Sequence, residues 1–200
     1  TDDKKGPLDL GAMTDRPPSL GATPPPPDGG TGVSASGERA ERSPRSQGGL
    51  AGLLDRVEGG GDYNTLFKFS NRDGGAFAGT KLTDMTLGDV YQFTSPSGDY
   101  GQWVAANNNG VVATPVGKNQ FVGSTLRNVA KGMGLPDDTP FNADTQDAMF
   151  NYHARNTIAG ASTMAGKRAA LRGQWVGLRS IPDSELDNAI LQFEQSGNTL

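Results

Sequence analysis

The stretch "LLDRVEGGGDYNTLF" (residues 53–67) changes abruptly from a helical pattern to a glycine-rich loop, with a carboxylate at the junction. Leu53, Leu54 and Val57 share one helix face, because residues three and four positions apart are neighbours on a helix. The three glycines that follow favour the end of that helix. Glu58 therefore lies at the helix C-terminus, where the macrodipole disfavours negative charge. It is either a solvated terminal residue or a proton donor held in a cleft.

The first 46 residues differ in composition from the rest of the 200-residue chain. They hold eight of its thirteen prolines, including a "PPPP" run, and hardly any large apolar side chain. Such a segment cannot bury enough surface to offset its ordering entropy, and its proline runs favour an extended polyproline II conformation. We therefore expect an extended or disordered tether over residues 1–46 and one folded domain over residues 47–200.

Composition and charge exclude several function classes. The chain has no cysteine, which removes disulfides, cysteine-ligated metals and thiol catalysis. Its single histidine, His153, is expected on a helix surface, and a zinc enzyme or a Ser-His-Asp hydrolase would depend on it alone. A net charge of −4 argues against nucleic acid. The sequence contains no apolar run of membrane-spanning length and no sign of a metal or another cofactor.

Periodicity after residue 46 predicts an α+β protein that is mainly α, with a small β or loop lobe inserted early. Helical patterns occupy residues 48–57 and 86–93 and most of the chain from residue 123 onward. Thr86, Asn142 and Asp183 are placed as N-caps, and Gly134 as a C-terminal stop. The intervening segments are rich in glycine, asparagine and aromatic residues, which is typical of turns or hairpins.

Glu58 differs in its surroundings from the other two glutamates after residue 46. Glu185 and Glu194 lie in an amphipathic helix near the C-terminus, where a solvated role is the default. Glu58 borders an apolar stripe and a glycine-rich loop. Partial burial there would raise the pKa of its carboxyl group and keep it protonated, as a general acid acting on a glycosidic oxygen requires.

Two further stretches carry polar residues next to helix starts. In "GKNQF" (residues 117–121), Gly117 permits close backbone approach and Gln120 either lines a cleft or satisfies loop backbone groups. In "FNADTQDAMF", Gln146 and Asp147 fall in the first turn of a helix, where an aspartate also simply complements the helix dipole. Each stretch is weak alone, but the order of "VEG", "GKNQF" and "TQDA" along the chain is informative.

This ordered set resembles the lysozyme-like superfamily of peptidoglycan-cleaving enzymes, particularly phage lambda-type lysozymes and related lytic transglycosylases. "VEG" stands where that family has Ser-Glu-Gly, "GKNQF" where it has Gly-Arg-Tyr-Gln-Phe/Leu, and "FNADTQDA" where it has Phe-Ser-Pro-x-x-Gln-Asp. The likeness spans about residues 47–180 and includes a late "LRGQWVGL" segment. It implies a lysozyme-like fold with Glu58 as the catalytic acid.

The chain departs from the family pattern at three positions. Asn119 replaces the usual aromatic, which puts a stacking role there in doubt, and Val57 replaces the usual serine. Phe67 stands nine residues after the acid, where other phage lysozymes hold an aspartate. Asp62 and Asp73 are the nearest alternatives for a second carboxylate, although Asp62 also fits a loop-shaping turn residue.

The resemblance implies cleavage of the β-1,4 bond between N-acetylmuramic acid and N-acetylglucosamine. A second carboxylate would support hydrolysis, whereas a single acid that then acts as a base would close a 1,6-anhydro ring on the muramoyl sugar. Because the two-acid spacing is absent, we favour the single-acid lytic transglycosylase route, with Asp62 retained as a second catalytic candidate.

Six residues are predicted to contact the glycan strand. Asparagine and threonine side chains offer donors and acceptors to hydroxyl and acetamido groups, and tyrosine rings pack on sugar faces. For Tyr63, burial is an equal alternative, and Trp103 has the same two alternatives. Trp175 is expected in the core. The substrate-binding candidates are Tyr63, Asn64, Thr65, Tyr100, Gly117 and Gln120.

A lysozyme-like module behind a proline-rich leader predicts a virion-associated, tail-borne phage hydrolase that acts in the bacterial cell wall. Residues 1–46 would bind phage tail or virion proteins, so that the tethered enzyme needs little electrostatic attraction to the wall. One alternative is a non-catalytic virion structural or wall-binding protein that keeps the scaffold. Another is an interaction module whose "PPPP" segment docks into an aromatic groove.

Overall fold

The computed structural model describes residues 49–58 and 60–196, and this part of the chain is mainly helical. The described residues form no paired strands and only three isolated bridges, which link Leu66 to Val116, Val116 to Phe121 and Thr86 to Pro140. The prediction of a mainly α protein is confirmed, and the early lobe consists of loops and short helices. The expected tether, residues 1–46, lies outside the described residues.

The elements are α1 (Gly49–Val57), η1 (Phe67–Phe69), η2 (Leu82–Asp84), α2 (Leu87–Phe93), α3 (Asp99–Asn107), α4 (Gly123–Met133), α5 (Ala143–Ala159), α6 (Met164–Gln174), η3 (Val176–Ser180) and α7 (Asp183–Gln195), where η marks a 3-10 helix.

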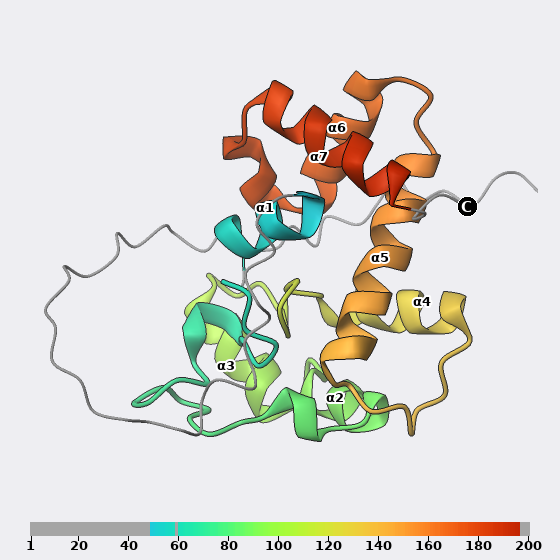
Figure 1. Ribbon diagram of the computed structural model, residues 1–200. Coiled ribbons are helices and arrows are strands. Elements are labelled where there is room, and N and C mark those ends of the chain that lie inside the picture. Colours follow the sequence, from blue (N-terminus) through green and yellow to red (C-terminus); the bar gives the residue numbers. More distant parts are fainter. Residues whose placement is uncertain (1–48, 59, 197–200) are drawn as a thin grey trace, which may run out of the picture.

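The long helix α5 connects two groups of helices (Figure 1). At one end, α5 packs on α6, which contacts η3 and α7, and α1 packs on both α7 and η3. At the other end α5 contacts α4, and the pair α2 and α3 lies beyond it. Helix α1 thus packs against segments that lie more than a hundred residues later in the sequence. None of the helices in the described part of the chain is long and apolar enough to cross a membrane.

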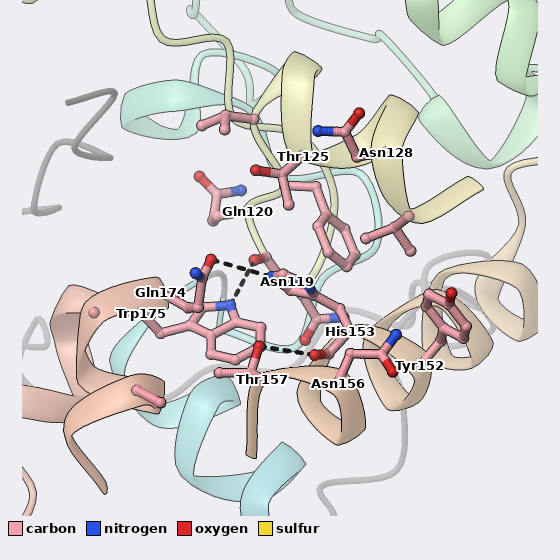
Figure 2. A pocket seen from close by; sticks show the side chains of 15 residues that line it. Asn119, Gln120, Thr125, Asn128, Tyr152, His153, Asn156, Thr157, Gln174 and Trp175 are labelled. Carbon is pink, nitrogen blue, oxygen red and sulfur yellow. Dashed lines mark hydrogen bonds between the residues drawn. The ribbon is translucent and has the colours of Figure 1, made fainter. Parts of the chain in front are cut away.

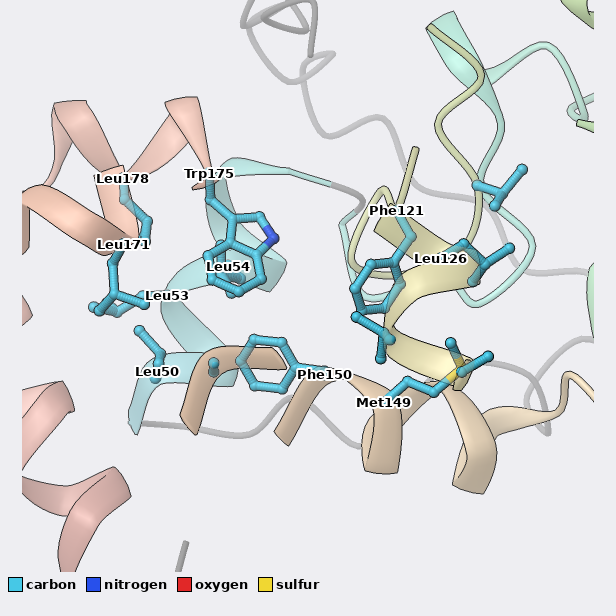
Figure 3. Packing of buried hydrophobic residues seen from close by; sticks show 14 of the residues in the cluster. Leu50, Leu53, Leu54, Phe121, Leu126, Met149, Phe150, Leu171, Trp175 and Leu178 are labelled. Carbon is cyan, nitrogen blue, oxygen red and sulfur yellow. The ribbon is translucent and has the colours of Figure 1, made fainter. Parts of the chain in front are cut away.

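Helix α1 is held in place by its apolar face. Leu50, Leu53 and Leu54 are buried, with the three- and four-residue spacing that places side chains on one side of a helix. Figure 3 shows these leucines facing Leu171 and Leu178 of the C-terminal group. The packing places α1 against the C-terminal group, close to the segment that the following residue, Glu58, contacts.

Aromatic rings of the early lobe cluster together and pack against the hydrophobic core. The ring of Phe77 makes edge contacts with Phe93, Tyr100 and Trp103 at centroid distances of 5.8, 5.2 and 5.6 Å. Phe93 and Tyr100 also stack at 4.7 Å. Such contacts add to the hydrophobic stabilisation of the buried rings. Helix α3 (Asp99–Asn107) supplies two of these rings, Tyr100 and Trp103.

Three of the predicted helix ends are confirmed. The hydroxyl of Thr86 accepts a hydrogen bond from the backbone N–H of Asp89, and the Asn142 side chain accepts one from the N–H of Thr145. Helix α4 ends at Gly134, whose φ of 68° lies in the left-handed region that glycine adopts without strain. These signals are local, so the sequence suffices to place them.

The predicted cap at Asp183 is wrong. Helix α7 begins at Asp183 itself, Pro182 occupies the cap position, and no side-chain cap bond forms. The Asp183 carboxylate instead pairs with Arg168 at 3.2 Å and Arg172 at 2.8 Å, both on α6. The Asp183 side chain therefore forms ion pairs with another helix instead of capping its own.

Candidate active site

Glu58 follows α1 directly and continues its hydrogen bonding, with its backbone N–H donating to the carbonyl of Leu54 at 2.8 Å. The side chain is half-buried, and its Oε1 accepts a hydrogen bond from the backbone N–H of Gly177 at 2.9 Å. A Cβ atom added at Gly177 would lie 2.8 Å from that Oε1 and 2.8 Å from the carbonyl oxygen of Val57. Glycine at position 177 therefore allows η3 to approach the carboxyl group closely.

Burial dominates the electrostatics of this carboxyl group. Removal from water raises the pKa of Glu58 above its ordinary value, and the hydrogen bond from Gly177 opposes that rise only in part. Burial and this hydrogen bond, rather than a charged neighbour, account for the direction of the shift. A carboxyl group in this state retains its proton to a higher pH than a solvated glutamate, which is the property of a general acid.

The second candidate acid, Asp62, is engaged in shaping its own loop. Its Oδ1 accepts a hydrogen bond from the backbone N–H of Asn64 at 2.8 Å, the two-residue pattern of an Asx turn. Asp73 is exposed in a turn of the early lobe. The geometry thus gives Asp62 the turn role that its sequence context offered as an alternative.

The "YNT" segment after the glycines is turned inward. Tyr63, Asn64 and Thr65 are all buried. The Tyr63 hydroxyl donates to Asp147 Oδ2 at 2.8 Å, and Asn64 Oδ1 accepts from the backbone N–H of Thr83 at 3.0 Å. These side chains were expected to contact sugar, and the structure instead gives them partners within the protein. The segment reaches inward because its polar groups find buried backbone and side-chain partners there.

The "GKNQF" and "TQDA" motifs meet in space at the "DYNT" segment (residues 62–65), which follows "VEG" and the glycines in the sequence. Gly117 donates its N–H to the carbonyl of Thr65 at 2.9 Å, and the Gln120 side-chain amide donates to the same carbonyl at 3.2 Å. The Gln146 amide donates to the carbonyl of Tyr63 at 3.1 Å and accepts from the N–H of Lys118 at 3.1 Å. The residues of "DYNT", "GKNQF" and "TQDA" thus form one hydrogen-bonded unit.

The backbone of "GKNQF" requires the residues found there. Gly117 has a φ of 76°, and a Cβ at that position would lie 2.3 Å from Gln146 Oε1. Gln120 has a φ of 49°, a left-handed conformation that costs a non-glycine residue about 1–3 kcal/mol. Its side-chain amide compensates by donating to the carbonyls of Gly117 and Thr65. Gln120 therefore satisfies loop backbone groups and also lines the pocket described below.

Tyr100, a predicted sugar contact, is part of the core. It is 1% exposed, its hydroxyl donates to the carbonyl of Pro115 at 2.5 Å, and it accepts from the backbone N–H of Phe67 at 2.9 Å. Burial accordingly raises the pKa of this phenol. Trp103 is half-buried against Phe67, at a ring-centroid distance of 6.3 Å. Both aromatic residues hold the early lobe together, because α3 supplies them to the cluster around Phe77.

A pocket of about 640 Å³ opens beside this unit, between the loop at residues 119–122 and helices α4, α5 and α6 (Figure 2). Its size falls within the range of small-molecule pockets. Its lining contains no aspartate, glutamate, lysine or arginine. Amide, hydroxyl and aromatic side chains prevail: Asn119, Gln120, Thr125, Asn128, Tyr152, His153, Asn156, Thr157, Gln174 and Trp175.

His153 was expected on a helix surface, and the structure places it in the pocket wall instead. Its ring lies 5.2 Å from that of Trp175 and 5.9 Å from that of Phe121, with Nε2 3.2 Å from Gln174 Oε1. Burial lowers the pKa of this imidazole. One sequence signal favours the inward position: His153 follows the buried Phe150 by three residues, which places the two on one side of α5.

Trp175 connects the pocket to Glu58. It is buried as predicted, and its indole N–H donates to the carbonyl of Asn119 at 3.3 Å. Gly177, two residues later, donates to the Glu58 carboxyl group. Glu58 itself is not among the residues that line the pocket. The acid and the pocket therefore lie on opposite ends of one short segment, residues 175–177.

The described residues bring no three histidine, aspartate or glutamate side chains together in a group that could hold a metal ion. The site thus combines the Glu58 carboxyl group, whose pKa is raised by burial, with a pocket whose lining is polar and holds no aspartate, glutamate, lysine or arginine. No protein-family model, curated protein or solved structure matches this chain.

Proposed function

We propose that this chain is a peptidoglycan-cleaving enzyme of the lysozyme-like superfamily, acting on the β-1,4 bond between N-acetylmuramic acid and N-acetylglucosamine. The observation that carries the proposal is the half-buried carboxyl group of Glu58, whose pKa is raised by burial at the end of α1. The meeting of "GKNQF" and "TQDA" with the "DYNT" segment in one hydrogen-bonded unit supports it, because "GKNQF" and "TQDA" are two of the three motifs that carry the resemblance.

Glu58 supplies the proton in the first step. Its carboxyl group protonates the glycosidic oxygen, the C1–O bond breaks, and positive charge spreads over C1 and the ring oxygen of the muramoyl sugar. The Glu58 carboxylate left behind then accepts a proton from the nucleophile that attacks C1. The hydrogen bond from Gly177 stabilises this carboxylate, so the same group serves as acid and then as base.

The nucleophile decides between hydrolysis and transglycosylation. A water molecule yields a reducing end, and the C6 hydroxyl of the muramoyl sugar yields a 1,6-anhydro ring. Asp62 has one carboxylate oxygen engaged by its own turn, and this supports the single-acid route to the anhydro product. We therefore favour the lytic transglycosylase reaction.

The neutral pocket suits a sugar ligand. Hydroxyl and acetamido groups need both donors and acceptors, and the asparagine, glutamine and threonine side chains of the lining offer both. Trp175 and Tyr152 add aromatic surface. A chain of glycan residues extending from the cleavage point past residues 175–177 would reach this lining.

The proposed setting is a phage virion, with the enzyme acting on the bacterial cell wall and residues 1–46 binding tail or virion proteins. It follows from the resemblance and from the composition of that segment. The alternative, a non-catalytic wall-binding protein on the same scaffold, is favoured by one observation. Asn119, where the family has an aromatic residue, is buried with both side-chain polar atoms unbonded.

Zymography on peptidoglycan tests the proposal with the full chain, the Glu58→Gln variant and a Glu185→Gln control on α7. We expect clearing from the wild type and the control and none from Glu58→Gln. Mass spectrometry of the released muropeptides then separates the two reactions, since anhydro ends and reducing ends differ by one water molecule. Equal clearing from all three proteins, or from none, refutes the role of Glu58.

A further inference from the structure

A buried lysine pairs with Asp55, one helical turn before the candidate acid. The Lys118 side chain is only 4% exposed, and its Nζ lies 3.3 Å from Asp147 Oδ1 and 3.7 Å from Asp55 Oδ1. The Tyr63 hydroxyl is 3.5 Å from the same nitrogen, and the ammonium group lies 5.0 Å from the centroid of the tyrosine ring. One cation is thus shared by two carboxylates and a phenol.

These groups come from four different parts of the chain. Asp55 lies on α1, three residues before Glu58 and therefore on the next turn of the same helix surface. Asp147 lies in the first part of α5, and Tyr63 lies in the loop after the glycines. Lys118 belongs to the loop that lines the pocket. Lys118 therefore connects the end of α1 to the first part of α5 and to the loop after the glycines.

A burial this complete has a cost that a surface ion pair does not have. Removing an ammonium group from water is unfavourable, and it is compensated only by close partners. Here the two aspartates raise the pKa of Lys118 despite its burial, so the lysine remains charged. Asp55 Oδ1 has no hydrogen-bond partner besides this 3.7 Å ion pair. Lys118 therefore supplies the positive charge that faces Asp55.

The loop that carries Lys118 is also linked to Glu58 through the segment at residues 175–177. From Lys118 the chain continues to Asn119, whose carbonyl accepts the Trp175 indole N–H at 3.3 Å. Gly177, two residues after Trp175, donates to Glu58 Oε1 at 2.9 Å. Glu58 is joined to Asp55 through α1, and Asp55 pairs with Lys118. Glu58 is thus linked to the residue 117–120 loop by two routes. One runs through Asp55 and Lys118, and the other runs through Gly177, Trp175 and Asn119.

We infer that Lys118 is a positioning residue for Glu58, which fixes the end of α1 against the residue 117–120 loop so that the carboxyl group stays in its half-buried niche. The inference deepens the proposed function and rests on it where catalysis is concerned. The geometric part, that Lys118 determines the surroundings of Glu58, is independent of any activity.

The direct test is an NMR titration of the Glu58 side-chain carboxyl carbon in the full chain. In Lys118→Met, release of α1 would hydrate Glu58 and lower its pKa toward the ordinary value of 4.5. Loss of a nearby positive charge alone would do the opposite and raise it. The sign of the change therefore separates positioning from a simple charge effect. Lys118→Arg should retain the wild-type titration, and Lys131→Met, an exposed lysine on α4, is the matched control.

A charge-neutral double variant keeps the test valid if Lys118→Met does not fold. Asp55→Asn combined with Lys118→Met removes one carboxylate together with its cation and leaves the net charge near Glu58 unchanged. Because loss of the Asp55 carboxylate by itself lowers the Glu58 pKa, the readout in this variant is amide hydrogen exchange at Gly177, whose N–H is bonded to Glu58. Faster exchange than in the wild type supports positioning. Wild-type exchange in this folded variant, or a wild-type or raised Glu58 pKa in folded Lys118→Met, overturns it. Failure of both variants to fold overturns it too, because Lys118 would then sustain the fold as a whole.

Activity measurements separate this inference from the proposed function. If Glu58 cleaves peptidoglycan, Lys118→Met should reduce kcat about tenfold or more, since sub-ångström to ångström displacements of a reacting group cost up to about a hundredfold. KM should change much less. A shifted Glu58 titration in a protein without wild-type activity would keep the positioning role and refute the enzyme assignment. An unshifted titration in an active enzyme would do the reverse.

Discussion

Substitution of Gly177 by alanine probes the niche of Glu58 without changing any charge. The added Cβ would lie 2.8 Å from three atoms: Glu58 Oε1, a methyl carbon of Val57 and the Val57 carbonyl oxygen. Real contacts of this kind lie beyond about 3.4 Å, so each neighbour must move by about half an ångström. The Glu58 side chain can rotate away, whereas the Val57 carbonyl belongs to the last residue of α1.

The expected loss of stability follows from two opposing effects. Overpacking of a filled site costs about 1–3 kcal/mol. Replacing glycine by alanine restricts the unfolded chain and returns about 0.4–1 kcal/mol where the backbone conformation permits it. The net destabilisation of Gly177→Ala is therefore about 1–2 kcal/mol, which lowers Tm by roughly 2–8 °C in a domain of this size.

The expected loss of activity is larger than the loss of stability. A carboxyl group displaced by half an ångström or more transfers its proton from a poorer position, and we expect kcat to fall about tenfold to a hundredfold. The pH above which activity declines should also fall, because Glu58 pushed toward water loses part of the burial that raises its pKa. Release of muropeptides as a function of pH measures both effects.

Gly160→Ala is the matched control. Gly160 follows α5 with a φ of −72°, which alanine adopts without strain, and nothing lies within 4 Å of its Cβ position. We expect unchanged activity and equal or slightly higher stability. Wild-type activity and an unchanged pH profile in a destabilised Gly177→Ala protein would refute the claim that η3 positions the acid.

Three further substitutions give opposite signs of stability change. Glu58→Gln should abolish cleavage and raise Tm at pH 7. Because the folded-state pKa of Glu58 lies above 4.5, the stability of the wild type falls as pH rises through that pKa. The gain in Tm should therefore vanish below pH 4.5 when thermal unfolding is measured as a function of pH. Tyr100→Phe removes the hydroxyl bonded to Pro115 and Phe67; the free energy of unfolding in urea should fall by about 1–3 kcal/mol while KM stays unchanged. Asn119→Leu removes two unbonded buried polar atoms and should leave the urea midpoint equal or higher, whereas a lower midpoint would show that the amide has a bound partner.

Local signals in the sequence were sufficient for most of the helix ends. The Thr86 and Asn142 caps and the Gly134 stop depend on residues within about four positions, so nothing distant competes with them. Asp183 failed as a cap because Arg168 and Arg172, on another helix, bind its carboxylate. Competition of that kind cannot be seen in a window of sequence.

The predicted sugar contacts show where residue type misleads. Tyr63, Asn64 and Thr65 are polar and lie in a loop, which resembles the composition of a binding site. Their partners, among them Asp147, are supplied by distant segments that bury them. Polar loop residues that are exposed and polar loop residues that are buried and bonded have the same sequence pattern, and only the packing separates them.

By itself, the sequence determined that the chain after residue 46 is mainly helical over the part that the structure describes, where several helices begin and end, and that one carboxylate stands at the end of the first. The tertiary structure alone decided the state of that carboxylate. Gly177 lies 119 residues from Glu58 along the chain, and its close approach both removes water from the carboxyl group and donates a hydrogen bond to it. Helix formation depends on neighbours in the chain, whereas desolvation depends on every atom that occupies the surrounding space, and folding brings those atoms from the other end of the protein.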